Sequence, residues 1–83
     1  MYLHLGLETV VKEKDVIGIF DLDSTTVSKH TRKFINKAEK EKKTVNVSYE
    51  LPKSFILAGE KQNLKVYISP LSSLTLYKRI GIL

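Results

Sequence analysis

One stretch of this chain carries its apolar residues with the period of an α-helix, and shorter stretches without that period flank it. Five residues at offsets of 0, 4, 7, 8 and 11 form one stripe on a helix of 3.6 residues per turn: Val27, Thr31, Phe34, Ile35 and Ala38. Residues 23–28, just before, are rich in side chains that cap helices. The pattern predicts an amphipathic helix over about residues 26–42, with its stripe packed on a sheet.

The flanking stretches predict short strands and one short helix. The β-prone runs are residues 2–5, 8–11, 16–22, 45–49, 54–58 and 64–68. Pro70 stops the last run, and Ser72 or Ser73 can cap a short final helix. We therefore expect an α+β fold: a small, mainly antiparallel sheet of about five short strands, one longer amphipathic helix and a short C-terminal helix.

The size of the chain raises the expectation of self-association. Its 83 residues fit a single domain, residues 1–83, and a domain of this size buries only about 60 to 65% of the surface that its unfolded chain exposes. The sequence has no cysteine and only two histidines, His4 and His30, so neither disulfides nor a zinc site are expected to reinforce it. We expect no cofactor, no metal and no membrane contact. The N-terminus has no basic start, and Glu8 interrupts it before the apolar core of a signal peptide could form. No apolar run is long enough to span a membrane, so we expect a cytoplasmic protein.

The net charge of +5 is concentrated in the predicted helix. Residues 29–43 hold seven basic and two acidic residues, whereas the rest of the chain is balanced at seven of each. The basic residues opposite the apolar stripe are Lys29, Arg32, Lys33, Lys40 and Lys43. Such a face is either an ordinary solvated helix surface or a surface for a polyanion, because lysines on one rigid face neutralise phosphates and release counterions. No aromatic residues alternate with these lysines, so stacking on single-stranded bases is not indicated.

One motif suggests catalysis. The apolar strand followed by Asp21-Leu22-Asp23-Ser24-Thr25 is similar to the first motif of haloacid-dehalogenase-type phosphatases, in which Asp21 would be the nucleophile and Asp23 the general acid and base beside Mg²⁺. Only four acidic residues follow Asp23, all of them glutamate, and about 60 remaining residues cannot build the doubly wound sheet of those enzymes. We therefore interpret both aspartates as polar residues at a strand end near a helix N-terminus, and expect no catalytic residues and no enzyme.

Three stretches together point to a family. They are residues 2–6 (Tyr-Leu-His-Leu-Gly), residues 16–21 (Val-Ile-Gly-Ile-Phe-Asp), and Pro52-Lys53-Ser54 followed by residues 67–79, which contain Ser-Pro-Leu-Ser-Ser. In order and spacing they resemble the RemA/RemB family of bacterial extracellular matrix regulatory proteins, in particular its RemB branch. The resemblance covers nearly the whole chain, and the Ser-Pro-Leu-Ser-Ser stretch is its most specific part.

The resemblance implies a non-enzymatic transcriptional regulator of biofilm-matrix genes. It also implies a sheet like that of LytTR DNA-binding domains, and ring-shaped homo-oligomers around which double-stranded DNA wraps. RemA-type members carry arginines after the strand tyrosine that matches Tyr49 and near the start of the third strand. Here Lys53 and Lys14 are the only basic residues at those places, so both become candidates for contacts with DNA phosphates, together with Lys29, Arg32, Lys33, Lys40 and Lys43.

Two further segments have alternative interpretations. Lys78 and Arg79 are secondary candidates for DNA contact, or basic residues that interact favourably with the C-terminal end of a helix dipole. The apolar tail with Ile80, Ile82 and Leu83 either folds back on the core or contacts a neighbouring subunit. The implied partners are double-stranded DNA, further copies of this chain and a paralogous regulator. The alternative function is a self-assembling protein-interaction module without direct DNA binding.

Overall fold

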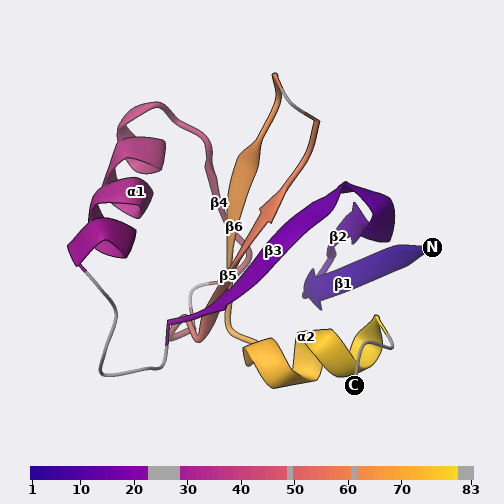
Figure 1. Cartoon of the computed structure of the whole chain (residues 1–83). Helices are drawn as coiled ribbons and strands as arrows, with labels where there is room; N and C mark the ends of the chain where they lie inside the picture. The colour runs from indigo at the N-terminus through magenta and orange to yellow at the C-terminus, as the bar shows by residue number, and fades with distance from the viewer. Residues whose placement is uncertain (23–28, 49, 61, 81–83) are drawn as a thin grey trace.

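The computed structural model describes residues 1–22, 29–48, 50–60 and 62–80. Within these ranges the α+β class, the long helix and the short C-terminal helix are confirmed. The elements in chain order are β1 (Tyr2–Gly6), β2 (Thr9–Lys12), the 3₁₀ turn η1 (Glu13–Asp15), β3 (Val16–Asp21), α1 (Lys29–Lys40), β4 (Thr44–Asn46), β5 (Ser54–Ala58), β6 (Lys65–Ser69) and α2 (Ser73–Arg79) (Figure 1).

The prediction of one sheet with about five strands is wrong. The described residues form a four-stranded sheet in the order β3-β5-β6-β4 and a separate two-stranded hairpin of β1 and β2. Strand β5 is antiparallel to both of its neighbours, and β4 is parallel to β6. The prediction failed for a physical reason. Alternating apolar residues can bury one face of a strand pair equally well against the face of a sheet or as part of its edge, so the pattern does not decide between the two arrangements.

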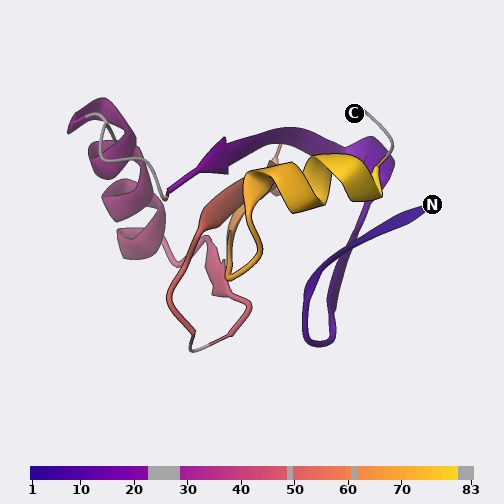
Figure 2. The ribbon, with the colours of Figure 1, turned by 90° about the horizontal axis from the view of Figure 1, so that it is seen from below.

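The four-stranded sheet is the middle layer of the molecule. Figure 1 shows α1 on one side of it, and the hairpin and α2 on the other, and Figure 2 shows the same separation from below. The alternation along β5 produces these two sides, because Phe55 packs with residues of α1 whereas Ile56 and Ala58 pack with the hairpin and α2.

The main core lies between the sheet, the hairpin and α2. Its buried members among the described residues are Leu3, Leu5, Val11, Ile19, Val47, Ile56, Ala58 and Leu76. Three side-chain hydrogen bonds fasten this side: the Ser69 hydroxyl donates to the Leu5 carbonyl at 2.6 Å, the Ser54 hydroxyl to the Leu71 carbonyl at 2.8 Å, and the Tyr77 hydroxyl to the Ile19 carbonyl at 3.0 Å. Both serines are fully buried, so each bond also satisfies a group that water cannot reach.

The hairpin approaches the sheet closely at Gly6. Its φ of 130° is one that glycine adopts readily, and a Cβ at this position would lie 3.1 Å from the Val47 side chain. Glycine therefore allows β1 to turn directly over the end of β4.

The helices follow the capping chemistry expected of them. Of the two predicted candidates, Ser72 and not Ser73 is the N-cap of α2, because its side chain accepts the Thr75 amide at 3.1 Å. Helix α1 ends at Lys40, two residues before the predicted end, because Lys42 has a φ of 58° and the Lys43 amide donates back to the Ala38 carbonyl at 2.8 Å. This is a Schellman C-cap formed without glycine. The predicted start of the helix and Val27 of its stripe lie outside the described residues.

A second, smaller core lies between α1 and the sheet. Its buried members among the described residues are Ala38, Phe55 and Val66, with Ile35 partly buried against them. The prediction that the stripe packs on the sheet is confirmed for Ala38 and Ile35. Phe34 keeps 44% of its surface exposed, although its ring lies 6.4 Å from that of Phe55.

Candidate nucleic-acid interface

The outer face of α1 is basic and exposed. The helix has five basic side chains, all of them exposed, and one acidic side chain, Glu39: the basic ones are Lys29, Arg32, Lys33, Lys37 and Lys40. The predicted outward orientation is thus confirmed for the described residues. Twelve helical residues extend about 18 Å, a length over which duplex DNA carries about ten phosphate charges. The face is therefore long enough to contact several phosphates on one side of a duplex.

The charge of this face is only slightly neutralised within the chain. The Lys43 ammonium, just beyond the helix, lies 3.2 Å from the Glu41 carboxylate, and both side chains are well exposed. An exposed pair of this kind contributes little to stability and breaks easily when a stronger anion approaches. Lys43 thus remains available for a phosphate.

Lys53 and Lys14 lie at opposite ends of the β3–β5 pair. The backbone of Lys53 is held at one end, where its amide donates to the Ser69 carbonyl and its carbonyl accepts the Leu22 amide. Lys14 lies in η1 at the other end, where the Asp15 carbonyl accepts the Gly59 amide. Both side chains are exposed, and the length of the strands separates them by on the order of 20 Å. One chain therefore does not bring the two lysines into a single site.

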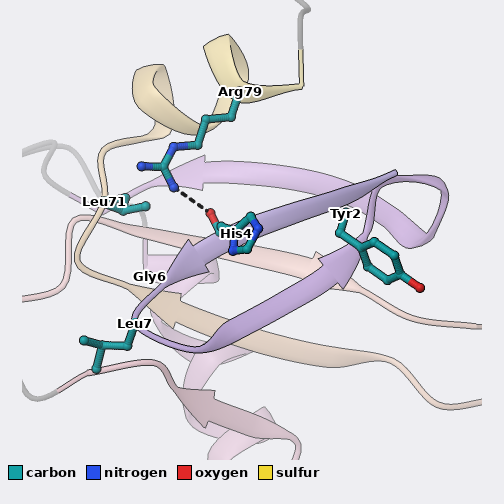
Figure 3. A pocket seen from close by; sticks show the side chains of 6 residues that line it. All are labelled: Tyr2, His4, Gly6, Leu7, Leu71 and Arg79. Atoms are coloured by element: carbon teal, nitrogen blue, oxygen red, sulfur yellow. Dashed lines mark hydrogen bonds between the residues drawn. The ribbon is translucent and has the colours of Figure 1, made fainter.

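The secondary candidates belong to yet another part of the surface. Lys78 and Arg79 occupy the last turn of α2, on the layer opposite α1. Figure 3 shows Arg79 reaching to β1, where its guanidinium donates to the His4 carbonyl at 3.1 Å. Arg79 and His4 border an open pocket of about 680 Å³, which Tyr2, Leu7 and Leu71 also line. Arg79 thus has a structural partner in its own chain, which joins the end of α2 to the hairpin.

Only the first two residues of the phosphatase-like motif, Asp21 and Leu22, lie within the described residues. Asp21 is exposed at the end of β3, opposite Ser54 in the strand register, and Asp23 lies outside the described residues. Within the described ranges, no three histidine, aspartate or glutamate residues are grouped so that they could hold a metal ion.

The tail predicted to contact a neighbouring subunit is described only at its first residue. Ile80 is partly buried against the main core of its own chain. Ile82 and Leu83 lie outside the described residues, so their role stays a prediction.

One surface feature was missed in the sequence. An apolar groove runs along α1, where Phe20 and Phe34 remain 45% and 44% exposed beside Phe55 and Leu57. Phe20 stacks on Phe55 across the strand pair, with ring centroids 4.7 Å apart. The only signal in the sequence was that Phe20 alternates with Ile19, so the two must face opposite sides of the sheet.

Comparison with known proteins identifies the family. A family model described as RemA-like, extracellular matrix regulatory protein A-like, matches residues 2–80. The chain belongs to the RemA-like family. It is also 39% identical over 79 residues to "Extracellular matrix regulatory protein B" of Bacillus subtilis (strain 168), a match that covers 95% of this chain and 89% of that protein.

The RemA-like match includes every basic residue discussed above and both sides of the sheet. The family and the relative are named as regulators of the extracellular matrix, which supports a regulatory role and not an enzymatic one. No helix among the described residues is long and apolar enough to cross a membrane.

Proposed function

We propose that this chain is a non-enzymatic, cytoplasmic transcriptional regulator of extracellular matrix genes that binds double-stranded DNA as a ring-shaped homo-oligomer. The observation that carries the proposal is the exposed basic face of α1, combined with membership in a family of matrix regulators. In this proposal the contacts are made to phosphates, so that the bendability of DNA and not a base code sets its preference.

Self-assembly is needed because one chain offers only a small basic surface. A ring repeats the α1 face many times along a duplex, and rigidly linked weak sites bind a long polymer much more tightly than one site does. A ring also lets Lys14 of one copy and Lys53 of another contribute to one continuous DNA-binding surface, although the two residues are far apart within one chain. A fold relationship to LytTR domains and pairing with a paralogous regulator are parts of the same proposal that rest on the family resemblance.

Binding to a long A·T-rich duplex across a salt series, with the oligomer mass measured in the same buffers, tests the proposal. We expect binding that requires the oligomer and weakens steeply with salt, as counterion release demands. Lys33→Glu should lower the affinity about tenfold or more, because the change repeats in every subunit, and Lys53→Ala should lower it less.

Lys12→Glu is the matched control, because it makes the same charge change at an exposed site on the hairpin, away from α1. Equal losses from Lys33→Glu and Lys12→Glu would indicate a general charge effect and contradict the α1 surface. An intact oligomer that does not bind the duplex at low salt would exclude a direct DNA role.

A second function is favoured by the apolar groove along α1. In that alternative the chain is a self-assembling interaction module, the groove is its working surface, and the lysines keep the assembly soluble. It predicts the same oligomers without affinity for DNA.

A further inference from the structure

The apolar groove along α1 is only partly filled by its own chain. Two hollows of about 320 and about 210 Å³ share Phe34 and Leu57 and together form what we call the α1 groove. Their apolar lining is completed by Phe20, Phe55, Leu64 and Val66. Aromatic side chains that remain nearly half exposed along one continuous groove are typical of an interface with another molecule.

The rim of the α1 groove carries a net positive charge, which disfavours direct contact between the grooves of two copies. Lys37, Lys43 and Glu41 line the groove, and Glu41 pairs with Lys43, so Lys37 leaves the rim with a net positive charge. Two copies that faced each other groove to groove would bring two basic helices together, which like-charge repulsion disfavours. The chemistry of the groove therefore fits a segment that combines an apolar side chain with an acidic one.

The turn between β1 and β2 has this combination. Leu7 is 78% exposed and has a φ of 42°, a left-handed conformation that glycine or asparagine adopts at lower cost. Glu8, next to it, is exposed as well. The two-residue hairpin turn accounts for the positive φ, but a leucine in it exposes apolar surface to water, and this exposed leucine is the indication of a contact with another molecule.

A second segment of the same kind lies on the same side of the molecule. Glu50 and Leu51, in the loop before β5, are exposed, Leu51 at 80%. Figure 2 shows this loop and the hairpin turn projecting in the same direction, and Leu7 and Val47 line one hollow between them. The two segments together present two leucines and two glutamates.

We propose that the hairpin turn of one copy, Leu7–Glu8, docks into the α1 groove of a second copy, with the Glu50–Leu51 loop beside it. Leu7 then enters the apolar groove and Glu8 lies against Lys37. The contact cannot form within one chain, because the hairpin packs on the face of the sheet opposite α1. Since the two surfaces differ, the contact is head-to-tail, and repetition closes a ring or extends a filament.

This inference rests on the self-assembly part of the proposed function and is independent of DNA binding. Its main test is the sedimentation mass of the full chain carrying Leu7→Asn. Asparagine suits a positive φ, so the variant should unfold at the same or a higher denaturant concentration than the unchanged protein when both are compared at dilutions at which they are monomeric. We expect its self-association to weaken about tenfold to a hundredfold, toward the 9.5 kDa monomer.

Leu74→Gln is the matched control, because Leu74 is 53% exposed on α2, away from both surfaces. It should leave the oligomer mass unchanged. An intact Leu7→Asn oligomer, or an equal loss with Leu74→Gln, overturns the proposed contact while leaving the DNA proposal to its own test. An unchanged protein that stays monomeric at all concentrations overturns self-assembly itself.

A charge exchange tests the pairing between the two copies. Glu8→Lys should weaken association several-fold, and Lys37→Glu in the same chain should restore most of that loss, because every contact then carries the reversed pair. Failure of the double variant to recover would show that Glu8 does not face Lys37. Deletion of residues 81–83 tests whether the C-terminal tail makes the subunit contact instead. If this variant dissociates while Leu7→Asn stays assembled, the contact belongs to the tail and the proposal is overturned.

Discussion

The two faces of the four-stranded sheet differ in how completely they are covered. The face toward the hairpin and α2 is sealed by a cluster of buried residues and by hydrogen bonds from Ser54, Ser69 and Tyr77. The face toward α1 has a small buried cluster beside the half-exposed rings of Phe20 and Phe34. Both faces belong to the same strands, so the difference comes from what covers them.

The comparison suggests a division of roles. Burial of apolar surface is the main source of stability, so the hairpin and α2 side holds most of the free energy of folding. The α1 side retains apolar surface that a partner can cover and carries the basic residues proposed to contact DNA. The marginal size of the chain makes this arrangement reasonable, because assembly can supply the burial that one copy lacks.

The largest effect should follow from removing a side chain in the well-covered core. Leu76→Ala, at a fully buried position of α2, should lower the free energy of unfolding by about 2 to 5 kcal/mol, because it deletes apolar contacts and leaves a cavity. Urea unfolding followed by circular dichroism measures the change. A loss of less than about 1 kcal/mol would contradict the assignment of the main core to this side.

An intermediate effect is expected where the hairpin is fastened to the sheet. Ser69→Ala removes the hydroxyl that donates to the Leu5 carbonyl at 2.6 Å and accepts the Leu71 amide at 3.0 Å. It should cost about 1 to 3 kcal/mol, because a buried carbonyl and a partly buried amide lose their partner. Hydrogen exchange should accelerate first in β1 and β2. Ser73→Ala, close in sequence but less buried, is the control and should change stability by much less.

The smallest effect is expected on the α1 side. Ile35→Ala, at a partly buried position of the stripe, should lower the free energy of unfolding of the monomer by about 1 kcal/mol, since less surface is lost and alanine favours helices. Amide exchange of α1 should accelerate, with the hairpin amides unchanged. Cooperative loss of the hairpin in this variant would show that the two sides are more strongly coupled than their packing indicates.

Much of the local structure could be predicted from the sequence. Residues 54–58 form β5 over the predicted bounds, and α2 is capped by Ser72, one of the two serines predicted to cap it. These features depend on residues that are neighbours in the chain: alternation for a strand, a hydroxyl before an apolar run for a helix. The end of α1 was misplaced because Lys42 forms a left-handed C-cap that usually requires glycine.

The arrangement of the candidate surfaces could not be predicted in the same way. The exposed orientation of Lys29, Arg32, Lys33 and Lys40 follows from the helical period and is confirmed. Which lysines share a surface depends on the strand register, which places Lys14 and Lys53 at opposite ends of the β3–β5 pair. The groove beside Phe34 depends on how α1 is placed across the sheet, and no local pattern encodes that placement.

The sequence by itself therefore determined the elements, their faces and the basic helix, because period, capping and charge act over a few residues. Only the tertiary structure decided that the hairpin lies on the sheet instead of joining its edge. It also decided that one face of the sheet is sealed and the other left partly open. The physical reason is that an apolar face contributes similar free energy against any complementary surface, so the choice among such surfaces depends on the packing of the whole chain.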